Sequence, residues 1–168
     1  AGHRLLPIAV NASVALARED APTQEYSEIL EKHNISARML EIELTETAVV
    51  SEYDRVKRLM SYFQSDGMQN SLDDFGSSLL NNIVDIPVNT IKLDKLFLTR
   101  CSSNARGTDF LREVVHLVKR LGYNVICEGI ETEEQVQLLR SLDCDGAQGF
   151  WFSKAIPAEE FERRYLCS

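Results

Sequence analysis

Several acidic, amide and basic side chains in this chain follow short apolar runs, where residues from different strands could meet around a metal ion. The most compact group is Asp73-Asp74, two adjacent acids that end an apolar run and precede Phe75 and Gly76. Adjacent carboxylates repel each other unless a cation lies near them. Two such acids, with a glycine that lets the backbone turn, suit a divalent cation. A solvated acidic turn is the alternative for this stretch taken alone.

The same position, at or just after the end of an apolar run, recurs along the chain. The residues that share it are Asn11, Glu43, Asp73, Asp74, Lys92, Glu128 and Gln148. The carboxylates and the amide oxygen of this set are hard ligands for Mg²⁺ or Mn²⁺. Lys92 could contact a phosphate oxygen or a metal-bound hydroxide, and Glu128 is a candidate base for activating water. Two metal ions about 3.5–4 Å apart would clamp both oxygens of a phosphodiester displacement.

Each of these residues also has a purely structural explanation. Lys92 and Asp94 could form a surface ion pair worth ~0–1 kcal/mol. Glu128 and Glu131 could be first-turn acids favoured by a helix dipole. Gln148 could be a satisfied polar group in a turn. The shared position at strand ends is what favours a common site over these separate explanations.

The elements that would position these residues alternate between strands and helices. Expected strands cover residues 8–10, 40–46, 68–72, 90–94 and 124–127, and a strand or turn covers 147–152. We expect the first of these to be buried. Expected helices cover residues 25–33, 51–63, 79–84, 109–121 and 158–165, and Thr132 with Gln135 forms a capping box that opens another helix.

Two of the expected helices have a clear apolar stripe. The first stripe consists of Val56, Leu59, Met60 and Phe63; the second consists of Phe110, Val114, Leu117, Val118 and Leu121. Strands alternating with helices predict parallel strands with helical crossovers. We count six such units, which predicts an α/β fold: a TIM-like (β/α) barrel, incomplete at its N-terminus. A doubly wound sheet is the alternative, since it too gathers strand ends in one crevice.

Composition limits the class of protein. The 168 residues suffice for one domain, which we expect to occupy 1–168, and the net charge of −8 argues against a nucleic-acid polymer as partner. No apolar run is long enough to cross a bilayer. The four cysteines Cys101, Cys127, Cys144 and Cys167 lack close ligand spacing and predict reduced, mostly structural thiols of a cytoplasmic protein. We also expect the chain to be a fragment of a longer protein.

Six motifs in series resemble the EAL family of cyclic di-GMP phosphodiesterases. They are residues 10–13 (VNAS), 41–46 (EIELTE), 72–76 (LDDFG), 91–94 (IKLD), 128–132 (EGIET) and 148–150 (QGF). The match is ordered and spans nearly the whole chain. It implies a TIM-like barrel that hydrolyses one phosphodiester of cyclic di-GMP to linear pGpG with Mg²⁺ or Mn²⁺.

The resemblance also implies a role for each matched residue. The metal ligands would be Asn11, Glu43, Asp73 and Asp74. Lys92 would contact the metal-bound water and Glu128 would be the general base. Glu131, Gln148 and Asp94 would support the site, and Glu46 would hold the loop after Asp74. The resemblance further implies a homodimer of this chain and an upstream sensory or diguanylate-cyclase-like domain in the full-length protein. The full-length protein could also be membrane-anchored, with this domain in the cytoplasm.

Two departures from the family pattern bear on activity. The Glu-Ala-Leu strand that names the family, whose Glu is also a ligand, would lie upstream of Ala1. The loop after Gly76 reads Ser77-Ser78-Leu79, whereas the family usually has Thr-Gly-Tyr before the serines. A non-catalytic cyclic di-GMP receptor within a larger signalling protein is therefore the alternative function. A metal phosphohydrolase acting on another substrate is a third hypothesis.

Overall fold

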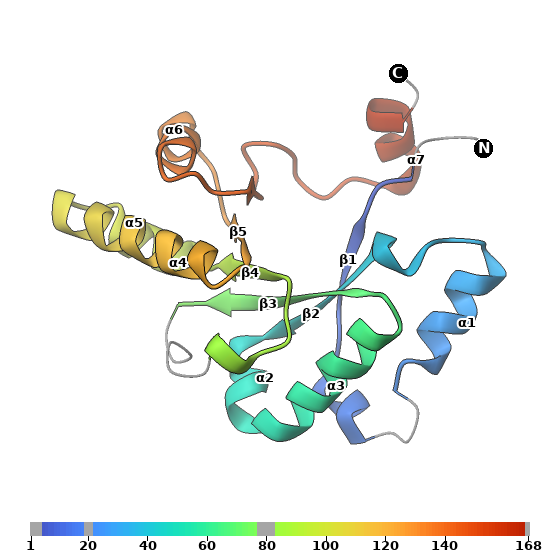
Figure 1. The fold of residues 1–168 in the computed structure, drawn as a ribbon. Helices are drawn as coiled ribbons and strands as arrows, with labels where there is room; N and C mark the ends of the chain where they lie inside the picture. The colour runs from blue at the N-terminus through green and yellow to red at the C-terminus, as the bar shows by residue number, and fades with distance from the viewer. Residues whose placement is uncertain (1–4, 19–21, 77–82, 167–168) are drawn as a thin grey trace.

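The computed structural model describes residues 5–18, 22–76 and 83–166. Its six strands are all parallel and form one sheet in the order β1-β2-β3-β4-β5-β6 (Figure 1). Their bounds are β1 Ile8–Asn11, β2 Leu40–Thr45, β3 Gln69–Phe75, β4 Thr90–Leu93, β5 Asn124–Cys127 and β6 Gly146–Ala147. Because every strand pairs with the next one in the sequence, the sheet is an open half-barrel. This order excludes the doubly wound alternative, in which the strand order reverses.

Helices connect the strands as crossovers. Their bounds are α1 Gln24–Lys32, α2 Glu46–Ser51, α3 Tyr53–Ser65, α4 Lys95–Cys101, α5 Ala105–Arg120, α6 Glu133–Ser141 and α7 Ala158–Phe161, with a π turn at Glu162–Leu166. Short 3-10 turns lie at Val14–Arg18, Ala37–Met39 and Ile83–Asp85. In Figure 1, α1 to α3 accompany β1 to β3, and α4 lies beside α5 near β4 and β5. None of the helices within the described ranges could span a membrane.

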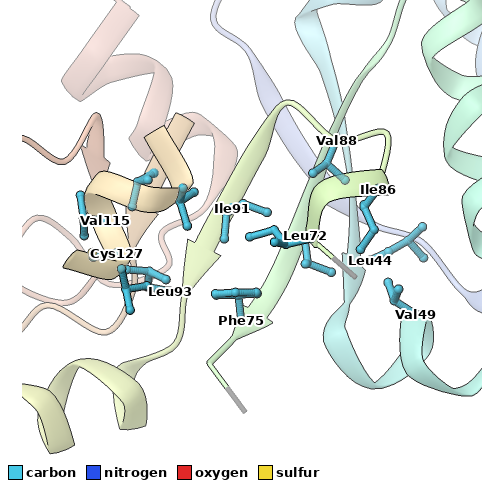
Figure 2. Packing of buried hydrophobic residues seen from close by; sticks show 14 of the residues in the cluster. Leu44, Val49, Leu72, Phe75, Ile86, Val88, Ile91, Leu93, Val115 and Cys127 are labelled. Atoms are coloured by element: carbon cyan, nitrogen blue, oxygen red, sulfur yellow. The ribbon is translucent and has the colours of Figure 1, made fainter. Parts of the chain in front are cut away.

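The two faces of the half-barrel differ in chemistry because side chains alternate along each strand. The face toward the helices is apolar: Leu44, Leu72, Ile91 and Leu93 are all buried there (Figure 2). The neighbouring positions on the other face are polar, and Glu43, Ser71 and Lys92 are buried there. The apolar face anchors the strands to the helices, so the polar face is free to carry a site.

Of the two apolar helix stripes expected from the sequence, one is confirmed and the other is partly wrong. In α3 the stripe Val56, Leu59, Met60 and Phe63 is buried, as predicted, and the left-handed Gly67 (φ 85°) follows the helix. In α5 the stripe was partly wrong. Val114 and Val118 are buried, but the other buried positions are Leu111 and Val115, whereas Phe110, Leu117 and Leu121 are exposed. The apolar side of this helix is wider than the part that packs, so spacing alone did not identify the buried positions.

Three further expectations need correction. Strand β1 exists but is not buried, and Ile8 is 63% exposed, because β1 is the edge of the open sheet and pairs with β2 only. Helices α2 and α4, six and seven residues long, were not expected. The helix expected over 79–84 lies partly outside the described residues, and its described end is the 3-10 turn at Ile83–Asp85.

Candidate functional site

The centre of the candidate site is Lys92, which lies between two carboxylates on the polar face of the half-barrel. Its Nζ is 2.6 Å from Oε1 of Glu43 and 2.5 Å from Oε1 of Glu128. The three residues come from β2, β4 and the position after β5. Lys92 and Glu43 are buried, and the side chain of Glu128 is 20% exposed. The structure therefore joins three of the strand-end residues that the sequence singled out. Lys92 forms buried ion pairs with Glu43 and Glu128, in place of the alternative of a surface pair with Asp94.

Burial and charge shift the pKa values of this cluster. Burial alone would lower the pKa of Lys92, but its contacts with Glu128 and Glu43 outweigh burial and raise that pKa above the ordinary lysine value. Lys92 is thus a permanent cation at neutral pH. For Glu128, burial raises the pKa of the carboxyl and Lys92 only partly offsets it. A raised pKa makes Glu128 a better proton acceptor than an exposed glutamate.

The oxygen donors Asn11, Glu43 and Asp73 lie at or near the carboxyl ends of the neighbouring strands β1, β2 and β3. Asn11 is the register partner of Glu43, and Asp73 is the register partner of Thr45. These carboxylate and amide oxygens have the chemistry of a Mg²⁺ or Mn²⁺ site. In the structure their carboxylates bond to protein groups: Glu43 to Lys92, and Asp73 Oδ1 to the N–H of Asp74 at 2.9 Å. Within the described ranges, no three or more His, Cys, Asp or Glu residues are gathered closely enough to hold a metal ion.

Gly76 was expected to let the backbone turn after β3, but the structure gives that role to another residue. The left-handed backbone occurs at Asp74 (φ 58°) and not at Gly76. Gly76 is required instead by close approach, since a Cβ there would lie 2.8 Å from Cβ of Phe97. The N–H of Gly76 donates to Oε2 of Glu46 at 3.1 Å. Glu46 is thus in contact with the start of the segment that the resemblance assigns it to hold. Residues 77–79, which carry the departure from the family pattern, lie outside the described residues.

Asp74 itself is exposed, and several acids surround it. Its pKa is raised, first by partial desolvation of the carboxyl and then by the negative charges of Asp73 and Asp94. Mutual repulsion of this kind favours a bound cation.

The remaining expected site residues have defined structural contacts. Oδ2 of Asp94 accepts from the N–H of Leu96 at 2.8 Å and so caps α4. Glu131 pairs with Lys95 at 2.6 Å. The backbone N–H of Gln148 donates to the carbonyl of Cys127 at 2.9 Å, while its side chain is exposed. Because α6 begins only at Glu133, neither Glu128 nor Glu131 lies in its first turn.

Sequence reasoning missed Lys95. Its stem fills the space beside Gly129, where a Cβ would lie 2.4 Å from Cβ of Lys95, and Gly129 has φ 68°. Lys95 therefore packs under the turn that follows Glu128 and also binds Glu131. The available signal was its position three residues after Lys92. Because β4 ends at Leu93 and α4 begins at Lys95, Lys95 lies at the same end of the sheet as the site.

The sequence matches one family and several curated proteins. The sequence model of the EAL domain matches residues 1–155. The chain is 31% identical over 155 residues to the oxygen sensor protein DosP of Escherichia coli, covering 91% of this chain and 19% of DosP. It is also 31% identical over 170 residues to the cyclic di-GMP phosphodiesterase NbdA of Pseudomonas aeruginosa, covering 98% of this chain and 22% of NbdA. The chain thus spans about a fifth of the length of these relatives.

Solved structures share the fold. The PaMucR phosphodiesterase in complex with c-di-GMP superimposes with a TM-score of 0.81 at 27% identity, over 92% of this chain and 64% of that one. The EAL domain of Mycobacterium smegmatis DcpA gives 0.84 at 28% identity, over 94% and 71%. Klebsiella pneumoniae BlrP1, in a manganese and cy-diGMP complex, gives 0.80 at 26% identity, over 88% and 38%. The α/β half-barrel therefore corresponds to part of a TIM-like barrel.

Proposed function

Because this chain belongs to the EAL-domain family, we propose that it is part of a metal-dependent phosphodiesterase that hydrolyses cyclic di-GMP to linear pGpG. The observation that carries the proposal is the buried Glu43–Lys92–Glu128 cluster, with distances of 2.6 and 2.5 Å, at the carboxyl ends of parallel strands. Those ends form the active face in (β/α) barrels. The choice of cyclic di-GMP as the substrate is supported by relatives named as cyclic di-GMP phosphodiesterases and by a similar solved structure of a c-di-GMP complex.

The proposed roles follow from charge and position. Glu128 accepts the proton of the attacking water, since its pKa is raised and part of its carboxylate is accessible. Lys92 holds Glu128 and Glu43 in place and supplies a fixed positive charge beside the phosphate. Asn11, Glu43, Asp73 and Asp74 would hold Mg²⁺ or Mn²⁺, which, when bound, neutralises phosphate charge and favours formation of the nucleophile. Gln148, Glu131, Asp94 and Glu46 support the loops around these residues.

The proposal extends to the whole protein. The chain would act in the cytoplasm, as a homodimer, downstream of a sensory or diguanylate-cyclase-like domain. Its match to about a fifth of long curated signalling relatives supports a multidomain setting. Sedimentation of the full-length protein tests the dimer.

The decisive assay is turnover by the full-length protein. Purified protein is incubated with Mg²⁺ or Mn²⁺ and cyclic di-GMP, and pGpG is measured by chromatography, with EDTA as the matched control. We expect metal-dependent pGpG. Tight cyclic di-GMP binding in EDTA with no product in metal would instead identify a non-catalytic receptor. Turnover of another phosphodiester, in place of cyclic di-GMP, would identify a different phosphohydrolase.

A further inference from the structure

Two cysteines outside the proposed site lie in contact with each other. The Sγ atoms of Cys127 and Cys144 are 3.7 Å apart, and Cys101, Cys127 and Cys144 are all free thiols. Cys127 ends β5 and Cys144 lies in the segment between α6 and β6. The spacing of 17 residues gave no indication of this contact in the sequence. Nothing in the proposed hydrolysis uses either thiol.

The two thiols differ in accessibility in the way that a redox pair requires. Cys127 is fully buried, beside Leu93 in the apolar layer between the sheet and the helices (Figure 2). Cys144 is partly exposed. A small oxidant can therefore reach Cys144 first, and Cys127 is placed to resolve the product. The hydrogen bond between the thiols supports this order, because it lowers the pKa of Cys144 and raises the pKa of Cys127.

A disulfide between the two cysteines requires a shorter contact than the 3.7 Å between their sulfur atoms. A disulfide has a sulfur–sulfur distance of about 2.0 Å, so the two atoms need to approach by roughly 1.7 Å. Cys144 follows Asp143, which has a left-handed backbone (φ 57°), in the short segment that leaves α6. Backbone hydrogen bonds hold both sides: the carbonyl of Cys127 accepts from Gln148, and the N–H of Cys144 donates to the carbonyl of Leu139 at 3.2 Å. The approach would therefore be shared between the two segments.

We propose that Cys127 and Cys144 form a reversible intrachain disulfide when the protein meets a small-molecule disulfide. The Cys144 thiolate attacks one sulfur of the oxidant, the oxidant's S–S bond breaks, and one thiol leaves. The Cys127 thiolate then attacks the sulfur of Cys144 and releases the second thiol. Each cysteine loses one proton, the pair loses two electrons, and the oxidant is reduced to two thiols. A soft metal ion is disfavoured, since the described residues bring no third His, Cys, Asp or Glu ligand to the pair.

The bridge would act next to the proposed catalytic base. Cys127 directly precedes Glu128, whose N–H donates to the carbonyl of Leu93 at 2.9 Å. Because Cys127 takes part of the approach, Glu128 would move with it, and a displacement of about 1 Å at a catalytic group can cost ~10²-fold in rate. This consequence rests on the proposed function: oxidised protein should hydrolyse cyclic di-GMP at least roughly tenfold more slowly, and dithiothreitol should restore the rate. Formation of the bridge itself does not depend on any activity.

The test is peptide mapping after native oxidation. Folded protein is treated with oxidised glutathione, blocked with iodoacetamide and digested with trypsin without reduction. Trypsin places each of the four cysteines on its own peptide, with Cys127 in residues 121–140 and Cys144 in residues 141–154. We expect these two peptides to be linked, and the link to disappear in dithiothreitol. Brief alkylation of the reduced protein should label Cys144 before Cys127.

Two variants make the result specific. Cys144→Ser should abolish the link and leave Cys127 unreacted, whereas Cys101→Ser should keep it; circular dichroism checks that both fold. The proposal is overturned if Cys144 accumulates as a glutathione adduct while Cys127 stays free in the folded wild type. It is also overturned if Cys127 links to Cys101 or Cys167, or if the link appears only in denaturant. Stoichiometric Zn²⁺ binding that protects both thiols would replace it with a metal site. If the link forms but cyclic di-GMP is not hydrolysed, the disulfide stands and only the proposed function fails.

Discussion

A single buried lysine organises the polar face of the half-barrel. Lys92 neutralises Glu43 and Glu128, two acids 85 residues apart in sequence that would otherwise repel each other on one buried surface. A buried ion pair contributes little net stability compared with apolar residues, but removal of one partner is costly. The arrangement is therefore better explained by the chemistry it allows than by the stability it provides.

Lys92→Met should lower the free energy of unfolding by about 3 kcal/mol, because it leaves two buried carboxylates without a cation. Urea denaturation followed by circular dichroism measures the loss. The matched control is Lys95→Met, whose pair with Glu131 is half-exposed and worth ~0–1 kcal/mol. Equal losses for the two variants would mean that the cluster is not electrostatically coupled.

The pH dependence of turnover should report Glu128. A general base must be deprotonated, and burial raises the pKa of this carboxyl. Activity should therefore fall as pH decreases, with a midpoint above the ordinary glutamate value of 4.5. A pH profile of kcat at saturating cyclic di-GMP tests this. An acid limb at or below that ordinary value would argue against Glu128 as the base.

At the scale of the elements, the strand ends were predictable and the helix faces only partly so. Short apolar runs identified β1 to β5, because each is bounded by polar or turn residues, and the Thr132–Gln135 capping box marked α6 correctly. The strand or turn expected over 147–152 overlaps β6 only at Ala147. The seven-residue α4 has too few residues for a periodic signal. In α5 two overlapping stripes have helical spacing, and only tertiary packing chooses between them.

The two stripes of α5 can be separated by experiment. Leu111→Ala should destabilise the protein by ~2–5 kcal/mol, because Leu111 is fully buried. Leu117→Ala is the same change in the same helix at a side chain that is 45% exposed, and should cost less than ~1 kcal/mol. Chemical denaturation of both variants gives the comparison. Similar costs would show that α5 packs on the side first expected from its sequence.

The residues of the candidate site could be predicted from the sequence, but the contacts between their side chains could not. Residue types at strand ends pointed to Glu43, Lys92 and Glu128, but the pair of Lys92 with Asp94 was the only specific pairing of Lys92 that the sequence offered, as an alternative explanation. Side chains at positions i and i+2 lie on the same face of a strand, but Asp94 falls after β4 ends and caps α4 instead. Contacts between distant strands depend on sheet register, which the sequence does not encode locally.

At the scale of the whole molecule, the sheet is open at β1 and carries its polar residues on one face. A ligand that binds the folded chain stabilises it by mass action. With Mn²⁺ present, cyclic di-GMP at 100 times its dissociation constant should stabilise the full-length Glu128→Gln variant, which should bind the ligand with little turnover, by about 2.7 kcal/mol. Thermal unfolding would show this as a rise in Tm. A mononucleotide is the matched control, and an equal rise with both would contradict a cyclic di-GMP site.

The most direct test of the central claim, that the Lys92-centred cluster performs hydrolysis, is the turnover of Glu128→Gln. This change keeps the size of the side chain and removes its ability to accept a proton. The account predicts a fall in kcat of at least ~10²-fold with cyclic di-GMP binding retained. Glu133→Gln, the same change at an exposed position in α6, should leave kcat unaltered. Wild-type kcat in Glu128→Gln would contradict the account.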